Sequence, residues 1–95
     1  MIYELTIVLE GKATAAKKKS VVELIEKLVK VSDGKVVKSD DWGTKDFAYP
    51  IGKINSGNYL FFELELGTEK IKDISLKLKL EEEILRYLLV KKEEN

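Results

Sequence analysis

Hydrophobic and polar residues alternate at the start of the chain. Between Ile2 and Leu9, the polar or smaller residues Glu4, Thr6 and Val8 separate a row of larger apolar side chains. The row consists of Tyr3, Leu5, Ile7 and Leu9. This period of two predicts a β-strand with one apolar face, which Gly11 ends.

The spacing of apolar residues changes to three, four and seven between Ala13 and Val31, which predicts an amphipathic helix. The recurring residues are Val21, Val22, Ile25, Leu28 and Val29. The sequence offers two alternative starting points for this helix, because Thr14 can cap it and Ser20 with Glu23 fits a capping box. We favour Thr14, since good helix formers follow it. Gly34 is expected to take the left-handed conformation after the helix.

A β-hairpin is predicted next. Its first strand begins at residues 35–38, is interrupted at 39–41 and resumes at 42–49, and its charges and glycine are typical of an edge strand. Pro50 and the cluster at 55–58 predict the connection. The second strand of the hairpin, residues 59–66, alternates most clearly. Leu60, Phe62, Leu64 and Leu66 share one face, and Tyr59, Phe61, Glu63 and Glu65 share the other.

A second helix is expected after Gly67, with Thr68 as its cap. Its predicted buried stripe is Ile71, Ile74 and Leu78, widened by Leu76 and Leu80. After three glutamates, the apolar run at 84–90 predicts a fourth strand. The order β-α-β-β-α-β, with right-handed crossovers, predicts an α+β ferredoxin-like plait, a four-stranded antiparallel sheet with two helices on one face. The first and third strands should be central.

We expect residues 1–91 to form this single domain and residues 92–95 a charged tail. The start of the chain lacks the features of a signal peptide, and no apolar run is long enough for a membrane span, so we expect a cytoplasmic protein without membrane contact.

The composition argues against enzyme chemistry. The chain contains no Cys and no His, which removes thiolate nucleophiles, imidazole bases and most metal ligation. Its densest carboxylates, Asp40–Asp41 and Glu81–Glu83, are neighbours in sequence that do not converge on one point. No phosphate-binding glycine-rich motif occurs. We expect no catalytic residues, cofactor, metal or small-molecule substrate.

Charge alone does not indicate a polyanionic partner, because 17 basic residues balance 17 acidic ones. We interpret the triplet Lys17–Lys19 as solvated surface. The sheet face away from the helices is more informative, since Tyr59, Phe61 and Glu63 should lie there with Glu4. Such a face can stack RNA bases, bind a protein or simply be residual apolar surface. Its carboxylates would repel phosphates, so a basic protein fits it better.

The segment Gly43–Ile51 resembles the signature of the bacterial small-subunit ribosomal protein S-six family, in which a glycine and a basic pair precede Ala-Tyr-Pro-Ile. The resemblance extends over the first, third and fourth predicted strands, at residues 3–9, 57–62 and 84–91. Here Asp46 stands in place of the second basic residue, Phe47 in place of leucine, and Gly52 follows the signature, so weaker RNA contact is expected at this loop.

The resemblance implies a non-enzymatic protein that binds the central domain of small-subunit ribosomal RNA. It also implies a heterodimer with the basic ribosomal protein S-eighteen. Lys45, Arg86 and Lys91 match basic positions of the family, and we assign them to phosphate contacts, with Lys92 as an adjacent candidate. The partner would contact Glu4, Tyr59, Phe61 and Glu63. The alternative is a regulatory or ligand-binding plait that dimerises through its open face.

Overall fold

The structure, a computed structural model, describes residues 1–51 and 54–92, with the backbone alone for 47–51 and 54–55. The strands are β1 (Ile2–Glu10), β2 (Lys35–Ile51), β3 (Ile54–Glu65) and β4 (Arg86–Lys91). The helices are α1 (Ala15–Val31) and α2 (Ile71–Lys79), and a 3₁₀-helix (Thr68–Lys70) leads into α2. Residues 93–95 of the expected tail lie outside the described residues.

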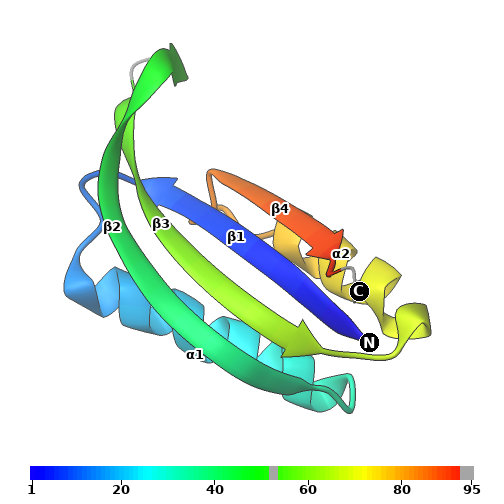
Figure 1. Ribbon diagram of the computed structural model, residues 1–95. Helices are drawn as coiled ribbons and strands as arrows, with labels where there is room; N and C mark the ends of the chain where they lie inside the picture. The colour runs from blue at the N-terminus through cyan, green and yellow to red at the C-terminus, as the bar shows by residue number, and fades with distance from the viewer. Residues whose placement is uncertain (52–53, 93–95) are drawn as a thin grey trace.

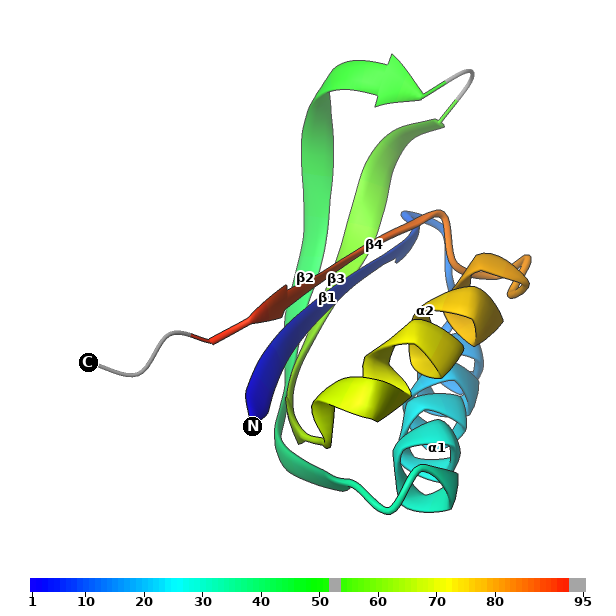
Figure 2. The ribbon, with the colours of Figure 1, turned by 90° about the vertical axis from the view of Figure 1, so that its right-hand side faces the viewer.

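The four strands form one antiparallel sheet in the order β2-β3-β1-β4 (Figure 1). Both helices pack on the same face of this sheet, and the other face is open (Figure 2). The predicted plait is therefore confirmed, with the first and third strands in the centre and β2 at an edge.

The core lies between the sheet and the helices. The alternating rows of β1 and β3 are buried as predicted, and Leu5, Ile7, Phe62 and Leu64 are fully enclosed. The helices contribute Val21, Ile25 and Val29 from α1, and Ile74 and Leu78 from α2. Burying each such side chain contributes about 1.5–3 kcal/mol, so these rows hold the two layers together.

Helix α1 begins where the sequence predicts. The Lys17 amide donates to Thr14 Oγ1 at 3.2 Å, which makes Thr14 the cap. The end of the helix differs from the prediction, because Asp33 has the left-handed conformation (φ 59°) and Gly34 does not. Gly34 is needed for another reason, since a Cβ there would lie 2.7 Å from the Glu65 carbonyl oxygen.

The connection of the β2–β3 hairpin was predicted wrongly. Strand β2 continues through residues 39–41 and 50 to Ile51, and β3 begins at Ile54, so residues 55–58 lie within a strand. The turn residues 52–53, including Gly52 of the family comparison, lie outside the described residues. The hairpin extends beyond the rest of the sheet (Figures 1 and 2). Turn propensity at 55–58 is overridden by pairing with β2.

Two expectations for α2 are also wrong. Thr68 does not cap the helix, since its hydroxyl donates to Met1 Sδ and the chain enters α2 through the 3₁₀-helix. Leu76 and Leu80 do not widen the buried stripe, because both are exposed, Leu80 to 79%. Leu80 is the cap residue directly after the last helical residue, Lys79.

Candidate binding surface on the open sheet face

The open face is made of alternate residues of four paired strands. The register places Glu4, Thr6 and Val8 of β1 opposite Glu63, Phe61 and Tyr59 of β3. On the other side of β1, the same three residues pair with Val90, Leu88 and Arg86 of β4. Residues paired across strands share a face. The predicted outward positions of Glu4, Tyr59, Phe61 and Glu63 are thereby confirmed.

Tyr59 and Phe61 lie on this face as predicted, but their rings are not both exposed. Phe61 is only 8% exposed, because Trp42 of β2 stacks on it with ring centroids 4.8 Å apart and planes 9° apart. Tyr59 is half-buried. Trp42 itself is 47% exposed, so it presents the outer aromatic surface. Leu88 and Val90, at 61% and 45% exposed, add apolar surface on β4.

Sequence reasoning missed Trp42 because β2 is irregular at this point. The pairing with β3 passes from Asp41 directly to Gly43, so Trp42 is the extra residue of a β-bulge. Gly43 has φ 78°, a conformation that a side chain would strain. A tryptophan directly before a glycine in an edge strand is the signal that could have indicated the bulge.

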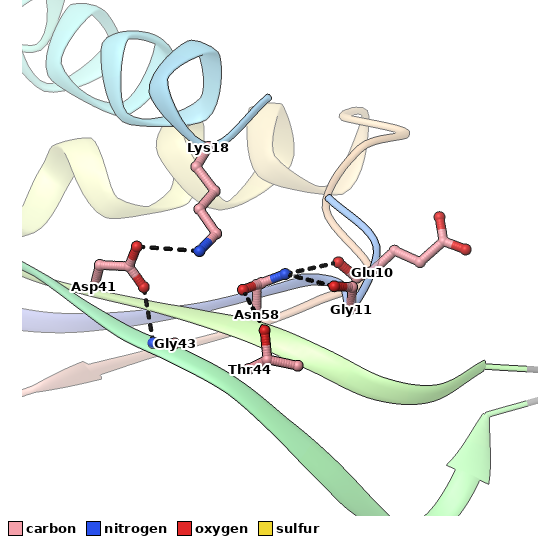
Figure 3. A network of polar contacts seen from close by, with 7 residues as sticks. All are labelled: Glu10, Gly11, Lys18, Asp41, Gly43, Thr44 and Asn58. Carbon is pink, nitrogen blue, oxygen red and sulfur yellow. Dashed lines mark hydrogen bonds and ion pairs between the residues drawn. The ribbon is translucent and has the colours of Figure 1, made fainter. Parts of the chain in front are cut away.

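A polar network fixes the bulge from the helix side of the sheet (Figure 3). The Gly43 amide donates to Asp41 Oδ1 at 2.8 Å, and Lys18 Nζ of α1 donates to Asp41 Oδ2 at 3.2 Å. The Gly43 hydrogen bond, together with Lys18, lowers the pKa of the Asp41 carboxyl group, against a smaller opposing effect of burial. Within the lysine triplet, Lys18 therefore links α1 to β2 rather than serving as solvated surface alone.

A second network holds the base of the hairpin against the loop after β1 (Figure 3). Asn58 is 1% exposed, and its Nδ2 donates to the carbonyl oxygens of Glu10 and Gly11 at 3.2 and 3.0 Å. Its Oδ1 accepts from Thr44 Oγ1 at 2.9 Å. Asn58 therefore fixes where the projecting hairpin leaves the sheet.

The structure does not gather the four predicted RNA contacts into one patch. Lys45 lies on β2, and its ammonium group is 5.7 Å from the Trp42 ring centroid and 5.6 Å from that of Tyr59. Arg86 and Lys91 lie on β4, at the opposite edge of the sheet. Lys92 Nζ is 3.2 Å from Glu63 Oε1, so a predicted RNA contact pairs with a predicted partner contact.

Lys91 is further separated from the others. It pairs with Tyr3, whose side chain is in the core, so Lys91 belongs to the helix side of the sheet edge. Arg86 shares a row of the open face with Val8, Tyr59 and Gly43. Lys45 and Arg86 are thus the predicted phosphate contacts that lie at the same end of the open face.

A cavity of about 520 Å³ lies elsewhere, between the loop after β1, the start of α1 and the loop before β4. Lys12, Lys17, Glu82 and Glu83 are among its lining residues. This charged lining differs from the mostly apolar lining of small-molecule sites. In the described residues, no group of three or more acidic side chains is arranged to hold a metal ion. No helix of the described chain has the length and apolarity to span a membrane.

Comparison with known proteins gives one consistent result. Residues 2–91 match the family model described as "Ribosomal protein S6". The chain is 32% identical over 88 residues to the small ribosomal subunit protein bS6 of Clostridioides difficile, covering 93% of this chain and 95% of that protein. It is 31% identical over 88 residues to the bS6 protein of Trichlorobacter lovleyi, covering 93% and 72%. The crystal structure of 30S ribosomal protein S6 from Thermotoga maritima has the same fold, with a TM-score of 0.88 at 23% identity over 96% of this chain and 86% of that chain.

Proposed function

The chain belongs to the ribosomal protein S6 family, which is not enzymatic, and from this premise we propose that it is a cytoplasmic structural constituent of the small ribosomal subunit. In this role it binds the central domain of small-subunit ribosomal RNA together with the basic ribosomal protein S-eighteen. The open sheet face is the observation that supports a protein partner most directly. Within residues 1–51 and 54–92, no helix covers it (Figure 2). It combines exposed Leu88 and Val90 with the carboxylates of Glu4 and Glu63.

The partner contact centres on Glu4 and Glu63, which pair with each other across β1 and β3. A basic partner matches these carboxylates, and Leu88 and Val90 supply apolar area beside them. Lys92 now neutralises Glu63, so a cation of the partner would take its place. Tyr59 and Phe61, which lie under Lys45 and Trp42, border this contact.

RNA binding rests on Lys45, Arg86, Lys91 and Lys92, which neutralise phosphates and set the orientation of the protein. Lys92 becomes available when the partner engages Glu63. RNA affinity should therefore rise when the basic partner is present. This coupling explains how a chain with 17 basic and 17 acidic side chains can act on RNA.

Co-sedimentation with small subunits lacking this protein tests the proposal, with and without the partner. We expect weak association of the chain alone and stronger association of the mixture, falling steeply with salt. A chain that stays unbound in both cases contradicts the proposal. A chain that dimerises alone and ignores RNA supports the alternative of a ligand-binding plait.

Two double variants that each remove two carboxylate charges test whether the partner binds the open face. Changing both Glu4→Gln and Glu63→Gln should weaken the heterodimer. The matched control is Glu23→Gln with Glu26→Gln, which removes two exposed carboxylates from α1 on the other side of the molecule. If the two double variants bind the partner with equal affinity, the open face is not part of the interface.

A further inference from the structure

The two ends of the open face carry different side chains. At one end, the row across the strands reads Gly43, Tyr59, Val8 and Arg86, and Trp42 with Lys45 lies over its β2 side. Two rows away, the positions are Lys38, Glu63, Glu4 and Val90. We call the first row with Trp42 and Lys45 the aromatic end, and the second the acidic end.

Acidic groups near the aromatic end are mostly neutralised or turned away. Asp40 is paired with Lys38 at 3.4 Å. The Asp41 carboxylate lies on the helix side, held by Lys18 and the bulge. Asp46 is exposed and next to Lys45 in sequence, and its pairing with Ser56 places it on the opposite face. Glu10, two strands from Lys45, is the further carboxylate of this neighbourhood. The aromatic end thus presents Lys45 and Arg86 on the open face, with Glu10 and Asp46 as the nearby acids.

The Trp42 ring is held in a fixed position without any ligand. One ring face rests on Phe61, and its backbone is held by the hydrogen bond between Gly43 and Asp41. The ring remains 47% exposed, with the Lys45 ammonium group 5.7 Å from its centroid. A fixed ring loses little conformational freedom on binding, which lowers the cost of association.

We propose that Trp42 is a stacking site for one unpaired RNA base, with Lys45 contacting the phosphate of the same nucleotide. An aromatic ring beside a cation matches a nucleotide, whose base offers a planar face and whose backbone is anionic. A basic protein segment fits this end poorly, because Lys45 and Arg86 would repel it. This inference rests on the proposed RNA-binding function and places the stacked base at the aromatic end, away from the partner contact at Glu4 and Glu63; Lys92, beside Glu63, remains a proposed phosphate contact.

Trp42 is the only tryptophan of the chain, so its fluorescence reports on this site alone. The probe is a transcript of the ribosomal RNA central domain, titrated into the heterodimer of the chain with a tryptophan-free form of its partner. We expect saturable quenching, with the same midpoint as binding measured by filter retention. Saturated filter binding without any change in Trp42 emission would overturn the proposal.

Substitutions distinguish stacking from a structural role. Trp42→Leu still covers Phe61 but cannot stack on a base, and should weaken RNA binding by roughly 5- to 150-fold. Trp42→Phe retains a ring and should restore most of the affinity. The salt slope is the slope of the logarithm of RNA affinity against the logarithm of salt concentration. Lys45→Gln should reduce this slope by about one, whereas Lys45→Arg should leave it unchanged. Urea midpoints of all four variants establish that they are folded.

The possible failures have different meanings. If Trp42→Leu binds RNA normally but loses the protein partner, Trp42 is a protein contact and the proposal is wrong. If the unaltered heterodimer does not bind the transcript at all, the proposed ribosomal RNA function fails, and the stacking site fails with it. If Trp42→Leu does not fold, the quenching and the two Lys45 variants still decide the outcome.

Discussion

Asn58 should contribute more to stability than any other polar side chain described in the hairpin. Its amide makes three hydrogen bonds, to the Glu10 and Gly11 carbonyl oxygens and from the Thr44 hydroxyl, at 3.2, 3.0 and 2.9 Å. At a net value of about 1 kcal/mol for each bond, Asn58→Ala should cost about 3 kcal/mol. That is a large share of the roughly 5–15 kcal/mol that stabilises a domain of this kind.

Urea unfolding measures this cost. With a typical m value of about 1–3 kcal/mol/M, the midpoint should fall by roughly 1–3 M, while m stays constant. Thr44→Val is the matched control, since it removes only the bond to Oδ1 at an exposed position and should cost about 1 kcal/mol or less. Equal costs for the two variants would refute the network as the source of stability.

Asn58→Asp adds a test by pH. The introduced carboxylate can accept from Thr44 but faces two carbonyl oxygens with no proton to donate, so its pKa in the folded state should rise above the unfolded value of about 3.9. A raised folded pKa makes the variant most unstable above that pKa, and stability should return as the pH falls toward the unfolded pKa. Unfolding curves of Asn58→Asp and Asn58→Ala that stay parallel between pH 7 and 4 would contradict this geometry.

Further outcomes follow from other positions. Gly43→Ala should cost about 1 kcal/mol in urea unfolding, because φ is 78° although the space around a Cβ is open. Gly34→Ala should cost more, since its Cβ would meet Leu66 Cδ2 and the Glu65 carbonyl oxygen; a smaller cost than for Gly43→Ala would contradict the packing there. The folded pKa of Asp41 is lowered, so its contribution is present at neutral pH and is lost as the pH falls through that pKa. For this exposed pair, Asp41→Asn should lower stability by no more than about 1 kcal/mol at pH 7, and by progressively less as the pH falls below the unfolded value of about 3.9. Arg86→Ala should reduce the salt slope of RNA binding by about one without changing the urea midpoint, and an unaltered slope would exclude a phosphate contact.

Local patterns predicted the elements whose structure depends on local spacing. The alternation in β1 and β3 and the cap at Thr14 follow from the sequence because each strand buries one face and the cap bonds three residues away. Strand β2 was harder, because each bulge shifts which residues face the core. Its pairing with β3 has three register irregularities, so a period of two cannot be followed along it.

The remaining errors involve contacts between residues distant in sequence. Residues 55–58 have turn composition, yet Asn58 bonds the Glu10 carbonyl oxygen 48 positions away, and no local signal reveals that contact. The same holds for Trp42, whose position over Phe61 depends on a bulge held by Lys18. The sequence therefore predicted the open face correctly, but not which aromatic side chain lies at its surface.

The net charge is zero, but the charged side chains are distributed unevenly between the two ends of the open face. Both proposed interactions depend on this distribution. Tyr59 at the aromatic end and Glu63 at the acidic end are four residues apart on β3, about 13 Å along an extended strand. This distance exceeds the screening length of about 8 Å at physiological salt, so the charges of Glu4 and Glu63 should have little effect on a nucleotide stacked at the aromatic end. Removing the charges of Glu4 and Glu63 should then weaken partner binding while leaving the RNA affinity of an already formed heterodimer nearly constant. A strong gain in that RNA affinity would mean that the two ends of the open face act as one electrostatic surface.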